Sequence, residues 1–101
     1  MRGGDSVIFS NILVPFDGSE PSIKSLQVAL KFAQGDPNVK INVVHVVQLP
    51  LKKVPTSLYN QVKKMIYDEG EATIQHAKEI TEDYANQVEC YIKEGAPMHT
   101  I

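Results

Sequence analysis

Residues 7–16, with the sequence VIFSNILVPF, decide the fold together with residues 17–21, DGSEP, which follow them. An almost unbroken apolar run rich in β-branched and aromatic residues is typical of a strand that is buried on both faces. In the second segment, turn residues and a helix start signal coincide, because Ser19 is suited to cap a helix and Pro21 falls in its first turn. The two segments therefore predict a buried strand that turns directly into a helix.

The rest of the chain continues this alternation of strands and helices. The predicted elements are a first helix that ends at 35–37, a second strand at 39–47, a loop at 48–56, a long helix that follows an N-cap at Thr56 or Ser57, and a third strand at 88–93. The long helix is expected to bury Leu58, Val62, Ile66, Thr73, Ala77, Ile80 and Tyr84. Polar and apolar residues alternate in the third strand, which predicts an edge strand, and residues 95–97 (GAP) predict a turn into a further helix.

The order β-α-β-α-β predicts an α/β fold with a parallel sheet and right-handed crossovers. A strand order of 3-2-1 would place both helices on one face and leave the other face bare, although the first two strands offer apolar side chains to both faces. It would also leave the first strand as an open edge. An order of 2-1-3 would put helices on both faces. The residues alone are compatible with a closed three-stranded unit, or with part of a larger sheet completed by absent residues or another chain.

Composition excludes several classes of protein. With 101 residues and ordinary hydrophobic (43%) and charged (22%) fractions, the chain is expected to be one globular domain. A net charge of −2 gives no electrostatic basis for nucleic acid binding. The apolar runs are too short to span a bilayer, and the N-terminus lacks the pattern of a signal peptide. Cys90 is the one cysteine, so neither an internal disulfide nor a zinc site built from cysteines can form. We therefore expect a cytoplasmic protein with no membrane or nucleic acid partner.

The chemically interesting residues follow the first strand. Ligands of open α/β sheets bind beyond the carboxyl ends of the strands, where Asp17 could accept a hydrogen bond from a ribose or reach a metal through water. Gly18 allows a close approach of the backbone, and the first helix offers N–H groups to an anion. The competing interpretation is that Asp17 and Ser19 only shape a turn and cap the helix.

Two segments resemble the universal stress protein family: residues 11–22, NILVPFDGSEPS, and residues 41–47, INVVHVV. The likeness continues to residues 95–97. It implies a Rossmann-like parallel sheet of the adenine nucleotide alpha hydrolase type, with strand order 3-2-1-4-5, of which residues 1–101 would be the N-terminal two-thirds. It also implies a homodimer, formed in this family through the final strand, and ATP binding in one subgroup.

The resemblance assigns half of a nucleotide site. Asp17 matches the aspartate that approaches the ribose and phosphates, with Pro15 and Phe16 adjacent and Ser19 nearby. Val46 matches the residue whose main chain contacts the adenine edge. ATP, with Mg²⁺, is the expected ligand. The family's glycine-rich phosphate loop, Gly-x2-Gly-x9-Gly-Ser/Thr, follows the fourth strand and does not occur in these 101 residues.

Three functions follow from these observations. The first is a universal stress protein that binds ATP and regulates a stress response. The alternative is a dimeric interaction module of the same fold that binds no nucleotide. A true hydrolase is favoured least, because the sequence shows no catalytic base, nucleophile or metal motif. His45, His76 and His99 are too scattered for a local metal motif, and Cys90 is better explained as a small core residue than as a nucleophile paired with His99.

Overall fold

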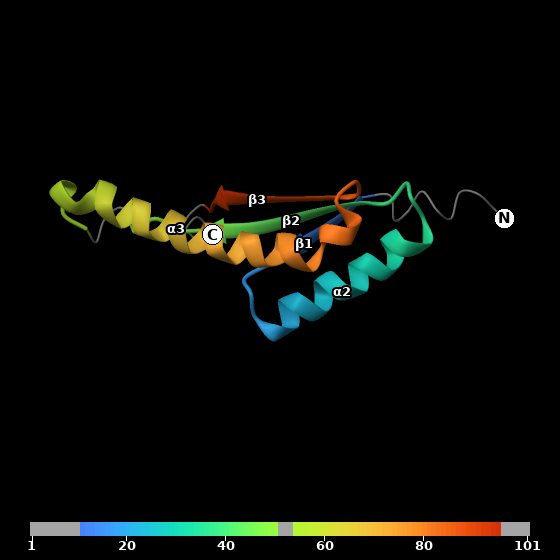
Figure 1. The fold of residues 1–101 in the computed structure, drawn as a ribbon. Helices are drawn as coiled ribbons and strands as arrows, with labels where there is room; N and C mark the ends of the chain where they lie inside the picture. Colours follow the sequence, from blue (N-terminus) through green and yellow to red (C-terminus); the bar gives the residue numbers. More distant parts are fainter. Residues whose placement is uncertain (1–10, 51–53, 96–101) are drawn as a thin grey trace, which may run out of the picture.

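The computed structural model describes residues 11–50 and 54–95 (Figure 1). Its elements are β1 (Asn11–Pro15), α2 (Glu20–Gly35), β2 (Lys40–Val47), a 3₁₀ turn (Thr56–Leu58), α3 (Tyr59–Ile80), a second 3₁₀ turn (Glu82–Tyr84) and β3 (Val88–Glu94). Residues 7–10 of the predicted first strand lie outside the described residues, as does the predicted helix after Gly95. No helix in the described ranges has both the length and the apolar character needed to cross a membrane.

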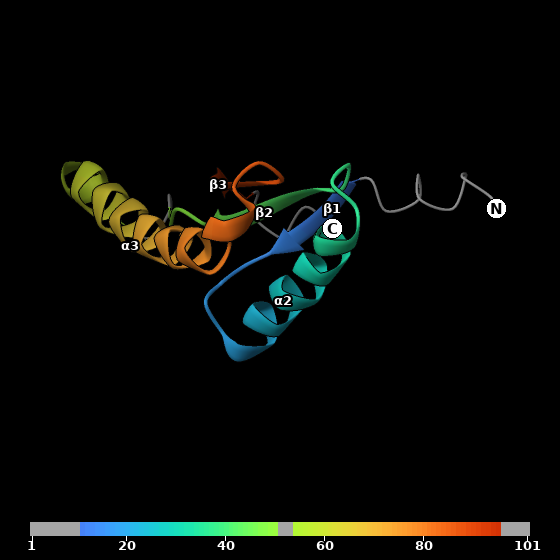
Figure 2. The same ribbon diagram turned by 45° about the vertical axis from the view of Figure 1, so that its right-hand side comes forward.

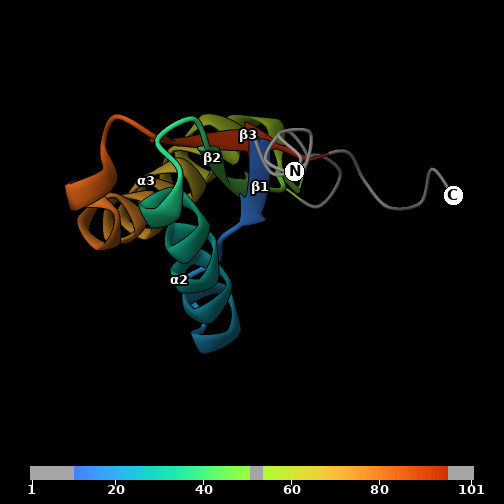
Figure 3. The same cartoon turned by 90° about the vertical axis from the view of Figure 1, so that its right-hand side faces the viewer.

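The three strands form one parallel sheet in the order β1-β2-β3, which confirms the predicted order 3-2-1 and excludes 2-1-3. Ile12 pairs with Ile41, and Ile41 in turn with Val88. Both crossovers step the same way across the sheet, so right-handed connections place both helices on the same face. Figure 1 shows α2 and α3 along the lower side of the strands, Figure 2 shows α3 to the left of the strands and α2 below them, and Figure 3 shows the strands above α2.

The core lies between the sheet and these two helices. β1 and β2 contribute the buried residues Val14, Ile41 and Val43, while α2 contributes Leu26 and α3 contributes Ala77. Ile41 and Val43 alternate along β2, and Val14 is the register partner of Val43, so all three lie on one face of the sheet. On β3, the residues that the register places on this face, such as Ile92, are partly buried against the core, which agrees with the predicted edge strand.

The other face of the sheet has no helix over it in the part of the chain that the structure describes. Leu13 is 66% exposed and Val46 is 51% exposed, although both belong to apolar strands. Val44, which lies between Pro15 and Tyr91 in the register, is the one position of β2 on this face that is buried. The apolar sequences of β1 and β2 are thus typical of strands covered on both faces, whereas helices cover only one face of the sheet in the described residues.

The long helix differs from its prediction at both ends. The predicted cap at Thr56 or Ser57 is wrong, because a 3₁₀ turn comes first and α3 starts at Tyr59 with no side-chain cap. Leu58 is 45% exposed instead of buried. Tyr84 lies in a separate 3₁₀ turn and not in the helix. A hydrogen bond from the N–H of Leu58 to the carbonyl of Pro55 (2.9 Å) closes the 3₁₀ turn that replaces the expected cap.

Candidate functional site

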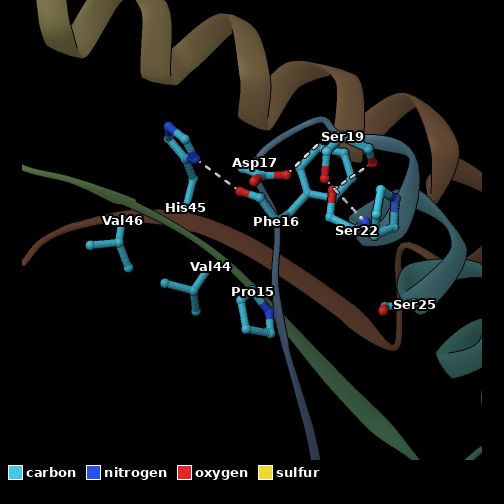
Figure 4. Close-up of a pocket in the computed structure, with 10 residues that line it drawn as sticks. Pro15, Phe16, Asp17, Ser19, Ser22, Ser25, Val44, His45 and Val46 are labelled. Atoms are coloured by element: carbon cyan, nitrogen blue, oxygen red, sulfur yellow. Dashed lines mark hydrogen bonds between the residues drawn. The ribbon is translucent and has the colours of Figure 1, made fainter.

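A cleft of about 410 Å³ lies at the carboxyl ends of β1 and β2, beside the N-terminus of α2 (Figure 4). It is lined by Pro15, Phe16, Asp17, Ser19, Pro21, Ser22, Ser25, Val44, His45 and Val46. Parallel strands end at the same edge of a sheet, so the turn after β1 and the last residues of β2 are brought together there. The cleft therefore combines residues that lie about thirty positions apart in the sequence.

The turn after β1 is shaped by its own side chains. Asp17 Oδ1 accepts a hydrogen bond from the N–H of Ser19 at 2.9 Å, and Gly18 adopts a φ of 83° that L side chains rarely adopt. The Ser19 hydroxyl and N–H, followed by the Ser22 hydroxyl, lower the pKa of Asp17 from 3.8 to about 2. Asp17 is therefore ionised at neutral pH. The stabilisation from these hydrogen bonds is present above pH 3.8 and is lost as the pH falls toward 2.

Ser19 caps α2 as the sequence predicts. Its hydroxyl accepts from the N–H of Ser22 (3.4 Å), and its carbonyl accepts from the N–H of Ile23 (2.9 Å). The hydroxyl of Ser22 donates back to the Ser19 carbonyl (2.9 Å). The turn-and-cap interpretation of Asp17 and Ser19 is thus correct as far as their local contacts go. Both residues nevertheless line the cleft, with the positive end of the helix dipole beside them.

Phe16 contributes its main chain to the cleft, while its side chain is 2% exposed in the core. The ring makes an edge contact with His76 of α3, with the ring centroids 6.0 Å apart. The N–H of Phe16 donates to the carbonyl of Val44 at 2.8 Å. The carbonyl of Phe16 accepts from Nδ1 of His45 at 2.8 Å. β2 therefore binds both main-chain polar groups of Phe16, the N–H through a main-chain carbonyl and the C=O through a side chain.

Val46 presents its main chain to the cleft beyond the end of β1. In a parallel ladder the N–H and C=O of alternate residues point to the same side. The carbonyl of Val44 points toward β1, where it accepts from Phe16, whereas the carbonyl of Val47 points toward β3 and accepts from Gly95. The N–H and C=O of Val46 must then point toward β1. The last register pair on that side is Pro15 with Val44, so Val46 has no strand partner there among the described residues.

Comparison with known proteins identifies the family. The model of the universal stress protein family matches residues 9–101. The chain belongs to the universal stress protein family.

Individual universal stress proteins are similar at low identity. A universal stress protein of Methanocaldococcus jannaschii is 21% identical over 103 residues, a match that covers 100% of this chain and 59% of that protein. The chain therefore spans about three-fifths of the length of this relative.

Three solved structures have the same fold as the described chain. A universal stress protein from Burkholderia pseudomallei has a TM-score of 0.69 and 22% identity, covering 89% of this chain and 66% of that one. UspA from Lactobacillus plantarum has a TM-score of 0.66 and 23% identity, covering 91% and 65%. A universal stress protein in complex with cAMP has a TM-score of 0.55 and 19% identity, covering 86% and 62%. The fold is the Rossmann-like, adenine nucleotide alpha hydrolase-like fold of universal stress proteins.

All five site residues predicted for this universal stress protein line the single cleft described above: Pro15, Phe16, Asp17, Ser19 and Val46. Their role toward a ligand stays a prediction. Sequence reasoning considered His45 for a metal motif and missed its bond to the Phe16 carbonyl. It also missed Ser22 and Ser25, which line the cleft. The one sequence feature that could have indicated them is the spacing of three between Ser19, Ser22 and Ser25, which places them on one side of the start of the helix. No group of three or more metal-ligating side chains occurs in residues 11–50 and 54–95.

Proposed function

We propose that this chain carries the first half of an adenine nucleotide site, with ATP as its ligand, and acts as a regulatory protein in a stress response. The main chain of Val46 is the observation that carries this proposal. Its N–H and C=O point into the cleft, beyond the end of β1. These two groups form a donor and acceptor pair with fixed geometry, because β2 is hydrogen-bonded to β3 through Val47.

Adenine matches this pair of groups. Its Watson–Crick edge offers an acceptor, N1, beside a donor, the N6 amine, which complements one N–H and one C=O. Guanine has these groups in the reverse order, with a donor at N1 and a carbonyl acceptor at C6. It would therefore place a donor against the Val46 N–H and an acceptor against the Val46 C=O. The Val46 side chain points to the bare face of the sheet, so an apolar residue serves here through its backbone alone.

The phosphate side of the proposed site lies at the turn after β1. Gly18 permits close approach of a ligand to the backbone, and the start of α2 favours an anion. Asp17 is an ionised carboxylate at this point, so it would repel a bare polyphosphate but attract one that carries Mg²⁺. We therefore place Mg²⁺ with the nucleotide, reached by Asp17 directly or through a water molecule.

Regulation is favoured over catalysis for this site. The residues lining the cleft include one ionised carboxylate and one histidine, and the histidine already holds the Phe16 carbonyl. A solved universal stress protein contains cAMP, which supports an adenine nucleotide in this fold. We propose further that residues 1–101 all belong to a single universal stress protein-like domain, that the protein works in the cytoplasm, and that it assembles as a homodimer.

Replacing Asp17 with asparagine tests the nucleotide site. Asparagine can still accept the Ser19 N–H, so the turn is retained while the charge is removed. With Mg²⁺ present, we expect Asp17→Asn to weaken ATP binding about tenfold in a calorimetric titration. Without Mg²⁺, the two proteins should bind ATP equally, or the variant more tightly, because the repulsion is removed.

The control for this experiment is Glu20→Gln, which removes an exposed charge next to the cleft but outside its lining. It should change affinity by less than twofold. GTP, titrated in parallel, should bind at least tenfold more weakly than ATP, since the Val46 groups would be left unpaired. Equal binding of ATP and GTP, or no binding of either, would contradict the proposed site.

The bare sheet face supports the second candidate, an interaction module. Leu13 is the most exposed large apolar side chain of the described residues and lies on this face. If this face mediates self-association, Leu13→Glu should raise the dimer dissociation constant at least tenfold, measured by sedimentation equilibrium. Val28→Glu introduces the same charge at a site on α2 that is 54% exposed, and it should leave the constant unchanged. A wild-type chain that stays monomeric at high concentration would rule out self-association through this face.

A further inference from the structure

The hydrogen bonds between β1 and β2 stop one step earlier than a regular ladder would. In a parallel pair, a residue that receives a bond at its carbonyl is followed two positions later by an N–H that donates back to the same neighbour. Since Phe16 donates to Val44, the next bond would run from the N–H of Val46 to the carbonyl of Phe16. That bond is absent among the described residues, and the Phe16 carbonyl accepts from His45 Nδ1 instead, at 2.8 Å.

The identity of this donor fixes the state of the imidazole. A carbonyl oxygen only accepts, so Nδ1 of His45 must carry the hydrogen. Figure 4 shows the ring directed from β2 toward the Phe16 carbonyl, away from the side chains of Val44 and Val46. The ring also lies against α3, because a Cβ atom built on Gly70 would be 3.3 Å from His45 Cδ2. Helix α3 therefore limits the positions that the ring can take.

We propose that His45 is a positioning residue that separates the two strands at the cleft. By directing the Phe16 carbonyl toward the imidazole ring, its Nδ1–H prevents the ladder from continuing and leaves the N–H of Val46 available to a ligand acceptor. The same bond orients the peptide unit that leads into Asp17. This inference rests on the proposed adenine site for its ligand, but the availability of the Val46 N–H is a property of the protein without ligand.

Two substitutions distinguish this role from a merely structural one. Asparagine places an amide N–H₂ near the position of Nδ1, so His45→Asn should keep the bond to Phe16. Leucine has similar bulk and no donor, so in His45→Leu the Phe16 carbonyl is free to accept the Val46 N–H. In the ligand-free protein, amide hydrogen exchange of Val46 should then become about tenfold slower in the leucine variant than in wild type.

The direction of this change makes the test sharp. A variant that is only less stable would exchange faster at every amide, including that of Val44, which lies in the paired part of the ladder. Slower exchange at Val46 alone, with wild-type exchange in His45→Asn, would support the proposal. Unchanged or faster exchange at Val46 in His45→Leu would overturn it.

Calorimetry with ATP and Mg²⁺ completes the experiment. His45→Leu should bind ATP about tenfold more weakly than wild type, while His45→Asn stays within about threefold. If the wild type binds no nucleotide but the exchange result holds, the proposed function fails and the role of His45 in parting the strands stands. If the wild type binds ATP and His45→Leu binds it equally well, the positioning role fails and the adenine site stands.

Discussion

Replacing Gly70 with valine should lower the free energy of unfolding by about 3 kcal/mol, because α3 has no room for a side chain there. A Cβ atom at Gly70 would lie 3.2 Å from Cγ1 of Val47 and 3.4 Å from Cδ1 of Ile92. Valine adds two further methyl groups to this contact, so the helix must move away from β2 and β3. In thermal unfolding, we expect Tm to fall by roughly 15 °C.

Alanine at the same position separates packing from helix propensity. Gly70→Ala should gain about 1 kcal/mol of helix propensity and lose a similar amount to the tight contacts, giving a small net change. Ala72→Val is the control, since this exposed position of α3 measures the cost of a β-branched residue alone. If Gly70→Val were no more destabilising than Ala72→Val, the close approach of α3 to the sheet would be refuted.

Replacing Gln87 with glutamate should cost about 3 kcal/mol, since its amide joins three parts of the fold. Nε2 of Gln87 donates to the carbonyls of Ala33 (3.1 Å), Asp36 (3.0 Å) and Val39 (3.0 Å). These carbonyls belong to the end of α2 and the approach to β2, whereas Gln87 directly precedes β3. A carboxylate has no hydrogen to donate and would face three acceptors in a partly buried place.

Chemical denaturation at neutral pH measures this loss. Gln87→Met removes the donors without adding a charge and should cost about half as much. Asn86→Asp is the matched control, since it makes the same change from amide to acid at the neighbouring exposed position and should be nearly neutral. The loss in Gln87→Glu should shrink as the pH is lowered, because the protonated acid regains one donor. A pH-independent loss would indicate that the charge is not responsible.

Much of the candidate site was predictable from residues that lie close together in the sequence. The turn chemistry of Asp17 and Gly18 and the capping role of Ser19 depend on hydrogen bonds over two or three positions, which local sequence specifies. The family resemblance adds Val46. The bond from His45 to Phe16 spans 29 positions, and no local pattern contains it. It exists because parallel pairing places the end of β2 beside the end of β1.

The same distinction holds for the helices. The start of α2 was predictable, because Ser19 and Pro21 form a local start signal. The start of α3 was not, because Thr56 and Ser57 are good caps that the chain uses within a 3₁₀ turn instead. By helix propensity alone, Gly70 is an unfavourable residue within α3. In the structure, Gly70 is a residue at which α3 approaches the sheet closely. This role follows from its contacts with β2 and β3, which the sequence of the helix does not show.

The sequence by itself determined the elements of this universal stress protein, their parallel arrangement and the residues of the turn at the cleft. These features follow from hydrophobic periodicity, turn chemistry and the handedness of crossovers, which act over short distances or apply to every chain. Hydrophobic periodicity left two strand orders open, and the family resemblance favoured the one that is adopted. Only the tertiary structure decided that one sheet face carries no helix in the described residues and that His45 bonds to the Phe16 carbonyl where the ladder would continue to Val46. Those outcomes depend on which side chains meet across the sheet, and contacts between distant residues leave no pattern in a single sequence.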